Sequence, residues 1–101
     1  MLIGGTYTTR MDSEERIERN LQLFMNWTPP EGFEFLHHWA RADGKGGVFI
    51  AEAASAAAIL EATAPWGPNM DFDIAPLVDI SEAVPTFLKV QEWTKGVGSL
   101  S

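Results

Sequence analysis

Residues 29–79 read PPEGFEFLHHWARADGKGGVFIAEAASAAAILEATAPWGPNMDFDIAPLVD, and this stretch decides the fold. Two apolar segments, 33–42 and 48–52, flank the glycine-rich turn DGKGG. Such turns are typical of β-hairpins, because glycine adopts positive φ without steric cost. A phosphate-binding loop would instead need a helix directly after the glycines. An alanine-rich segment over 56–63 and an alternating segment over 70–78 follow, so the stretch predicts strand, strand, helix, strand.

The segment before this stretch adds a strand and a helix. Residues 2–9 are rich in Thr, Tyr and Ile, which favour strands. Asp12 or Ser13 is expected to cap the helix that follows. Apolar residues recur in this helix at helical spacing and are expected to pack against the sheet: Ile17, Leu21, Phe24 and Met25. Ser81 is expected to cap one extra C-terminal helix.

The resulting order, βαββαβ, predicts an α+β ferredoxin-like fold with a four-stranded antiparallel sheet. Both helices should lie on one face of the sheet, because crossover connections are right-handed. We expect a single domain over 1–95 and a flexible tail over 96–101. The other face of the sheet has no cover within such a domain. A second copy of the chain is expected to cover it, which predicts a homodimer.

The bulk composition excludes several classes of function. The chain has 101 residues and a net charge of −7, and its basic residues are scattered, so neither nucleic acid nor an anionic membrane is an expected partner. The absence of cysteine excludes disulfides and thiolate chemistry. No apolar run approaches the roughly 20 residues of a membrane span, and the first residues lack the pattern of a signal peptide. We therefore expect an acidic cytoplasmic protein.

The predicted hairpin register assigns side chains to the two faces of the sheet. With the turn over 43–47, His38 lies opposite Glu52. The face expected under the helices carries Phe35, His37, Trp39, Phe49 and Ala51. The other face carries Glu34, Leu36, His38, Ala40, Val48, Ile50, Glu52, Asp71 and Asp73. A shift of one residue would exchange these faces, because strand side chains alternate.

His38 and Glu52 are the candidate catalytic residues. A carboxylate beside an imidazole raises its pKa and fixes its tautomer, which suits acid–base catalysis. The alternative is a polar cross-strand pair within a dimer interface.

The nearby acids also have the donor atoms of a divalent-metal site. However, His37 and His38 are adjacent in a strand and point to opposite faces, so they cannot easily hold one ion. We expect no metal and no other cofactor.

A second set of candidates suits a small apolar or aromatic ligand. Trp39 and Trp66 are potential pocket walls, although aromatic residues at alternating strand positions are also the normal core of a sheet. Trp66 lies in a loop rich in Pro and Gly, and Asn69 beside it is placed to orient a ligand carbonyl. The polar face adds the ligand-binding candidates Glu34, Asp71 and Asp73.

Several short motifs, in this order, resemble those of a bacterial family, the domain of unknown function 3303. They are Pro30-Glu31-Gly32, Leu36-His37-His38-Trp39, Asp43-Gly44-Lys45-Gly46-Gly47, Glu52-Ala53, Pro65-Trp66 and the run from Asp71 to Asp79. The resemblance covers the chain up to about Ala83. It implies membership of the dimeric α+β barrel group, in which two ferredoxin-like sheets pair into a barrel. That group includes antibiotic-biosynthesis-type monooxygenases, muconolactone isomerase-like enzymes and dimers without known activity, and the resemblance carries over no catalytic residue.

We therefore expect a homodimer that binds a small apolar or aromatic ligand. One alternative is a cofactor-independent monooxygenase or isomerase, with His38 as the base and with Trp66 and Asn69 shaping the pocket. Another alternative is a structural or regulatory dimer without catalysis.

Overall fold

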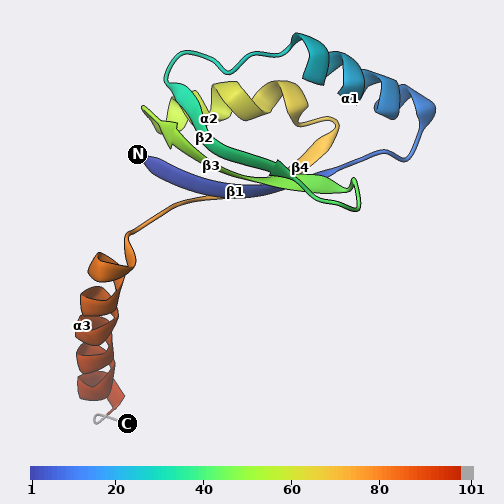
Figure 1. Cartoon of the computed structure of the whole chain (residues 1–101). Helices are drawn as coiled ribbons and strands as arrows, with labels where there is room; N and C mark the ends of the chain where they lie inside the picture. Colours follow the sequence, from blue (N-terminus) through green and yellow to red (C-terminus); the bar gives the residue numbers. More distant parts are fainter. Residues whose placement is uncertain (99–101) are drawn as a thin grey trace.

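The computed structural model describes residues 1–98, and its elements follow the predicted order (Figure 1). Along the chain they are β1 (Leu2–Thr9), α1 (Glu14–Asn26), β2 (Phe33–Ala40), β3 (Gly46–Ala53), α2 (Ala56–Thr63), the short 3₁₀ helix η1 (Ala64–Trp66), β4 (Met70–Pro76) and α3 (Ile80–Gly98). The strands form one antiparallel sheet in the order β2-β3-β1-β4. Helices α1 and α2 lie on the same face of this sheet (Figure 1). The predicted ferredoxin-like fold with an extra C-terminal helix is confirmed.

Side-chain caps start the first two long helices. The Ser13 hydroxyl accepts a hydrogen bond from the backbone N–H of Arg16 at 3.2 Å, and Ser55 does the same for Ala58. Each cap satisfies one of the amides that a helix leaves unpaired in its first turn. The predicted cap at Ser81 is wrong. Helix α3 begins one residue earlier, and the Asp79 carboxylate accepts from the backbone N–H of Ser81 at 2.8 Å.

The buried core lies between the sheet and the helices. Ile3 of β1 and Phe49 of β3 are almost completely buried there, under Ala62 of α2 and Trp66 of η1. Gly5 lets Phe49 lie flat on the sheet, because a Cβ at Gly5 would stand only 2.6 Å from the Phe49 ring. The helix-facing side of the sheet is therefore rich in aromatic rings.

Helix α1 packs on the sheet mainly through residues outside the predicted set, although Phe24 of that set contacts the buried Trp66. Asn20 is fully buried, and Leu23 and Trp27 pack against the core. The predicted packing residues are between 40% and 79% exposed: Ile17, Leu21, Phe24 and Met25. The prediction counted apolar residues only, so it had no means of placing a polar side chain such as Asn20 on the buried face.

A bulge in β2 overturns the predicted hairpin register. Phe35 pairs with Ala51 and His37 pairs with Ile50, which leaves Leu36 as an extra residue in its strand. A bulge exchanges the two faces of a strand beyond it, because side chains alternate with a period of two. The face predicted for Phe35 is thus correct, whereas all predicted faces from residue 37 to residue 40 are exchanged.

The main consequence concerns His38. It lies opposite Phe49 on the helix-facing side of the sheet, and Trp39 lies opposite Val48 on the other side. The predicted pairing of His38 with Glu52 is wrong, because Glu52 pairs with Glu34.

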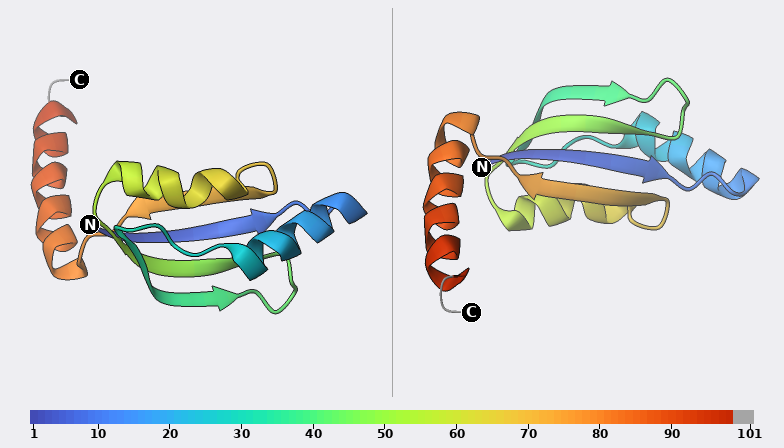
Figure 2. Two further views of the ribbon diagram at one scale, coloured as in Figure 1. Left: turned by 90° about the horizontal axis from the view of Figure 1, so that it is seen from above. Right: turned by 90° about the horizontal axis from the view of Figure 1, so that it is seen from below.

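No helix of residues 1–98 covers the face of the sheet opposite α1 and α2, as the view from below shows (Figure 2). Helix α3 stands beside this sheet and projects away from it (Figures 1 and 2). Large apolar side chains on α3 are between 46% and 72% exposed: Ile80, Val84, Phe87, Leu88, Trp93 and Val97. Of the predicted tail over 96–101, residues 96–98 belong to α3, and residues 99–101 lie outside the described part of the chain. Within residues 1–98, no helix has the length and hydrophobicity needed to cross a membrane.

Candidate aromatic ligand site

A cavity of about 290 Å³ lies between the sheet and the helices. The sheet contributes Tyr7, Phe33, Phe35, His38, Phe49 and Phe72 to its wall. The helical side contributes Phe24, Trp27, Ala62, Thr63 and Trp66. Among the described residues, no Asp, Glu, Lys or Arg lines this cavity. The site is therefore apolar and aromatic, with Tyr7, His38 and Thr63 as its polar members.

Trp66 contacts the other aromatic rings on the helical side of the cavity. It follows Pro65 in η1, is only 5% exposed, and lies with its ring centroid 4.7 Å from that of Phe24 and 5.5 Å from that of Trp27. Tilted and edge-to-face pairs at such distances are favourable beyond the area that they bury. The sequence predicts Trp66 as a pocket residue, and in the structure its ring forms part of the cavity wall.

Tyr7 and His38 form one hydrogen-bonded pair in this wall. The Tyr7 hydroxyl lies 2.7 Å from His38 Nε2, and the imidazole stacks on the Phe35 ring with centroids 4.5 Å apart. The two residues come from β1 and β2, which are separated by β3 in the sheet. The pair can meet across β3 because Gly47, which is paired with Tyr7 in the sheet, has no side chain.

Partial desolvation favours the uncharged form of both members of the pair. Desolvation lowers the pKa of His38 below its ordinary 6.5, because the imidazolium form loses hydration in the apolar wall. Desolvation likewise raises the pKa of Tyr7 above 10.0, because the phenolate form loses hydration. A neutral phenol thus faces a neutral imidazole, which is available to accept a proton.

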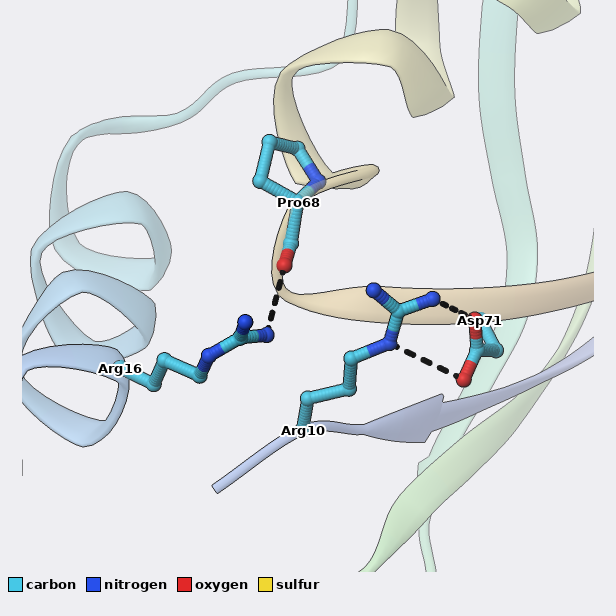
Figure 3. Close-up of polar contacts among 4 residues, drawn as sticks. All are labelled: Arg10, Arg16, Pro68 and Asp71. Carbon is cyan, nitrogen blue, oxygen red and sulfur yellow. Dashed lines mark hydrogen bonds and ion pairs between the residues drawn. The ribbon is translucent and has the colours of Figure 1, made fainter. Parts of the chain in front are cut away.

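Two arginines from the N-terminal part of the chain form polar contacts with the segment that follows Trp66 (Figure 3). Arg16 of α1 donates to the backbone carbonyl of Pro68 at 3.0 Å, which connects α1 to the loop that follows Trp66. Arg10 donates from Nε to the Asp71 carboxylate at 3.2 Å and forms a second contact through Nη2. Hydrogen bonds from Arg10 hold the pKa of Asp71 below its usual range. Asp71 is thus committed to Arg10 and does not line the cavity.

The other predicted acids lie on the uncovered face of the sheet. Glu52 Oε1 is 3.0 Å from the N-terminal amine of Met1, and Glu34 lies opposite Glu52 in the neighbouring strand. Asp73 lies opposite Thr6, on the same face. The structure therefore separates these carboxylates from His38, which it places in the cavity wall on the opposite face.

Two further candidates lie outside the cavity. The Trp39 ring stacks on His37 at a centroid distance of 5.1 Å and is 54% exposed on the uncovered face. The prediction that Trp39 lies under the helices is wrong, because the bulge at Leu36 turns it outward. Asn69 is buried. Its backbone N–H donates to the carbonyl of Trp66, and its backbone carbonyl accepts from the N–H of Arg10, at 2.8 Å each. It thus supports the loop that carries Trp66.

Asn20 is a polar side chain that the sequence analysis did not single out. It is fully buried under α1, and neither of its amide atoms has a hydrogen-bond partner within residues 1–98. Asn20 is not among the residues that line the cavity. An unpaired buried amide costs roughly 1–3 kcal/mol, so Asn20 lowers the stability of the packing between α1 and the sheet.

Metal binding has no structural basis in the described part of the chain. Across residues 1–98, no group of three His, Asp or Glu side chains comes close enough to hold one ion. His38 and the acids Glu34, Glu52, Asp71 and Asp73 lie on opposite faces of the sheet.

The residue that sequence reasoning missed is Tyr7. Its strand alternates Ile3, Gly5 and Tyr7 on one face, a period-two pattern that places the phenol under the helices. That pattern was readable from the sequence, but pairing Tyr7 with His38 also requires the position of the β2 bulge.

A four-stranded antiparallel sheet, two helices on one face and an aromatic cavity between them define a small α+β protein of the ferredoxin-like class. The sequence profile of the domain of unknown function DUF3303 matches residues 1–91, so the chain belongs to this family. The match extends to within α3 and thus covers every strand of the sheet. Among curated proteins, none matches the sequence.

Proposed function

We propose that this protein binds a small apolar or aromatic molecule in the cavity between the sheet and α1. The observation that carries the proposal is the cavity itself, which combines walls of Phe and Trp rings with a single hydrogen-bonded pair, Tyr7 and His38. Ligand sites typically have this composition, with mostly apolar walls and a few polar groups that set the orientation.

The volume limits the size of the ligand. About 290 Å³ is near the lower end of the roughly 300–1,000 Å³ found for ligand pockets. An apolar cavity of about 150 Å³ accommodates benzene, so this one has room for two fused rings or for one ring with a short substituent.

The proposal is tested by calorimetric titration with 2-naphthol, a neutral bicyclic probe. From the binding energy that a ligand of this size typically gains per atom, we expect a Kd on the order of 100 µM. Thr63→Phe places a ring in the cavity and should weaken binding at least about tenfold, because the probe loses the space it occupies.

Leu60→Phe is the matched control. Leu60 lies one turn earlier in α2, is 67% exposed and does not line the cavity, so its variant should bind 2-naphthol as the unmodified protein does. Equal binding by the Thr63→Phe variant, with its fold intact, would place the probe elsewhere. Absence of binding by the unmodified protein would leave the structural or regulatory dimer as the better proposal.

A second candidate function is proton-transfer catalysis, which the neutral state of His38 favours. A neutral imidazole in an apolar wall can take a proton from a carbon next to a ligand carbonyl, and Tyr7 is close enough to support the charge that develops. Return of the proton to another carbon is an isomerase reaction. A cofactor-independent monooxygenase would in addition need dioxygen as oxidant and a substrate anion that supplies the electrons.

This candidate is tested with 2-tetralone, a bicyclic ketone, by following hydrogen–deuterium exchange at its α-carbons by NMR. The rate should fall as the pH drops through the His38 pKa, because only the neutral imidazole accepts a proton. Since burial lowers that pKa, the midpoint should lie below 6.5. Tyr7 is the only other titratable group among the described lining residues. An exchange rate no faster than in buffer, or an undiminished rate in His38→Gln, would remove the candidate.

We also propose that the protein acts as a homodimer joined through the uncovered face of the sheet. The accessible surface is 7356 Å², about 1,700 Å² more than a compact monomer of 11.1 kDa exposes. The radius of gyration is 18.3 Å, against about 13 Å for a compact domain of this length. This excess includes the surface of α3, which projects away from the sheet (Figure 1). It is larger than the ~800 Å² that each partner buries in a stable complex, so the chain as a whole exposes enough surface for a dimer.

The uncovered face itself has the chemistry of an interface. Its exposed apolar side chains are Leu2, Leu36, Trp39, Val48 and Leu77. Two of its carboxylates are paired within the chain, Glu52 with the N-terminal amine and Asp71 with Arg10. Glu34 and Asp73 lie on the same face, so we expect them to remain hydrated at the rim of the interface in the dimer. Native mass spectrometry should then give twice the 11.1 kDa of one chain.

A further inference from the structure

A second cavity adjoins the first one at the Tyr7–His38 pair. It has a volume of about 350 Å³ and extends toward the β2–β3 turn, where Thr9, Met11, Ala40, Gly44 and Gly46 line it. The two cavities share three lining residues, Tyr7, Phe24 and His38. We call the first the inner cavity and the second the outer cavity. The phenol–imidazole pair thus stands at the junction of two spaces.

The hydrogen-bonding capacity of the pair is only half used. If Tyr7 donates to His38 Nε2, the phenol oxygen remains an acceptor and Nδ1–H remains a donor. If His38 donates instead, the hydroxyl remains a donor and Nδ1 an acceptor. Within residues 1–98, the side chains of Tyr7 and His38 form no further side-chain hydrogen bond. In both arrangements the pair can satisfy one further oxygen atom.

We propose that Tyr7 and His38 recognise the oxygen of an aromatic ketone or phenol. The ring of that ligand lies in the inner cavity, and any substituent beyond the oxygen-bearing carbon lies in the outer cavity. This inference rests on the proposed function, since it requires the inner cavity to bind a ring.

The surroundings restrict the ligand to a neutral molecule. No charged side chain of the described residues lines either cavity, so a carboxylate or ammonium group would lose its hydration without gaining a partner. An oxygen-free ring would in turn displace water from the Tyr7–His38 pair and leave that pair's remaining donor and acceptor unmatched. The site should therefore prefer an oxygen-bearing ring to its hydrocarbon analogue.

Two pairs of matched probes distinguish recognition of a ketone oxygen from recognition of a phenol oxygen. Acetophenone and α-methylstyrene differ in a carbonyl oxygen against a methylene group, and phenol and toluene differ in a hydroxyl against a methyl group. One net hydrogen bond should make the oxygen-bearing member of at least one pair bind about 3- to 10-fold more tightly, as measured by NMR titration. The pair that shows the preference identifies the ligand as a ketone or a phenol.

Substitutions of Tyr7 and His38 test whether these two residues cause the preference for the oxygen-bearing probe. Tyr7→Phe keeps the ring that packs near Phe49 and Phe72 but removes the hydroxyl, so the preference should decrease while the hydrocarbons bind unchanged. His38→Phe should give the same result through the other partner. His37→Gln is the control, because His37 lies on the opposite face of the sheet and should keep the full preference.

The outer cavity is tested with a longer ketone, butyrophenone. Ala40→Phe narrows the outer cavity only, since Ala40 does not line the inner one. It should weaken butyrophenone binding several-fold and leave acetophenone binding unchanged.

The possible failures are distinguishable. Equal binding within both probe pairs, or a preference that is undiminished in both Tyr7→Phe and His38→Phe, would overturn the oxygen-recognition inference while the inner cavity stays a ring-binding site. An unchanged affinity of Ala40→Phe for butyrophenone would overturn the role of the outer cavity. If no probe binds, hydrocarbons included, the proposed function fails and this inference fails with it.

Discussion

The Gly47→Ala variant should lose about 1–3 kcal/mol of folding free energy, the usual cost of overfilling a packed site. A Cβ at Gly47 would overlap the Tyr7 hydroxyl and stand 2.7 Å from the backbone oxygen of Trp39. The sheet holds Tyr7 on one side of Gly47 and the backbone of β2 on the other, so neither neighbour can move away freely. The expected fall in Tm is on the order of 10 °C for a domain of this size.

The same variant should also lose its preference for an oxygen-bearing ligand, because the displaced Tyr7 ring no longer meets His38. Thermal unfolding followed by circular dichroism measures the first effect, and titration with acetophenone and α-methylstyrene measures the second. Gly96→Ala is the control. Gly96 lies within α3, where alanine is the better helix former, so the variant should be as stable as the parent or slightly more stable. A Gly47→Ala protein with unchanged Tm would contradict the close packing of Tyr7 over β3.

The Trp39→Asp variant should convert the proposed dimer into a monomer. Trp39 lies on the edge strand β2 and is 54% exposed on the uncovered face, and tryptophan is prominent among residues that dominate interface energies. The interface of a two-fold dimer contains two copies of the substituted residue. A loss of about 2 kcal/mol of association free energy at each copy weakens association roughly a thousandfold. Sedimentation equilibrium measures this change directly.

Leu60→Asp is the matched control for the interface. Leu60 is 67% exposed on α2, on the covered side of the sheet, so the variant should remain a dimer. Dissociation of both variants, or of neither, would move the interface away from the uncovered face. The Trp39→Asp monomer should still bind 2-naphthol, because the cavity wall consists of residues from one chain.

The fold was predictable because its signals are local. The Asp-Gly-Lys-Gly-Gly turn, the serine caps and the alanine-rich helix each act over a few residues, and the structure has the strand and helix order that they predict. The alternation in β4 also gave correct faces, with Phe72 lining the cavity and Asp71 turned away from it.

The site was not predictable because it depends on one residue in β2. Leu36 lies within the uniformly strand-like run FEFLHHWA, with no Gly or Pro to indicate a bulge. Phe35, just before the bulge, packs against Trp27 from the segment after α1, a tertiary contact that the local sequence does not reveal. Because a bulge exchanges faces, the prediction joined His38 to Glu52, whereas the structure joins His38 to Tyr7. The same limitation explains the buried Asn20, whose position is set by packing and not by hydrophobic periodicity.

The four tryptophans offer the most direct test that the cavity is a ligand site. Trp27 and Trp66 line it, whereas Trp39 lies on the uncovered face and Trp93 on α3. Their indole Nε1–H signals can be followed by ¹H–¹⁵N NMR during titration with 2-naphthol. A ligand in the inner cavity should shift the signals of Trp27 and Trp66 in a saturable manner and leave those of Trp39 and Trp93 in place. Shifts confined to Trp39 and Trp93, or no shifts at all, would contradict the assignment of this cavity as the binding site.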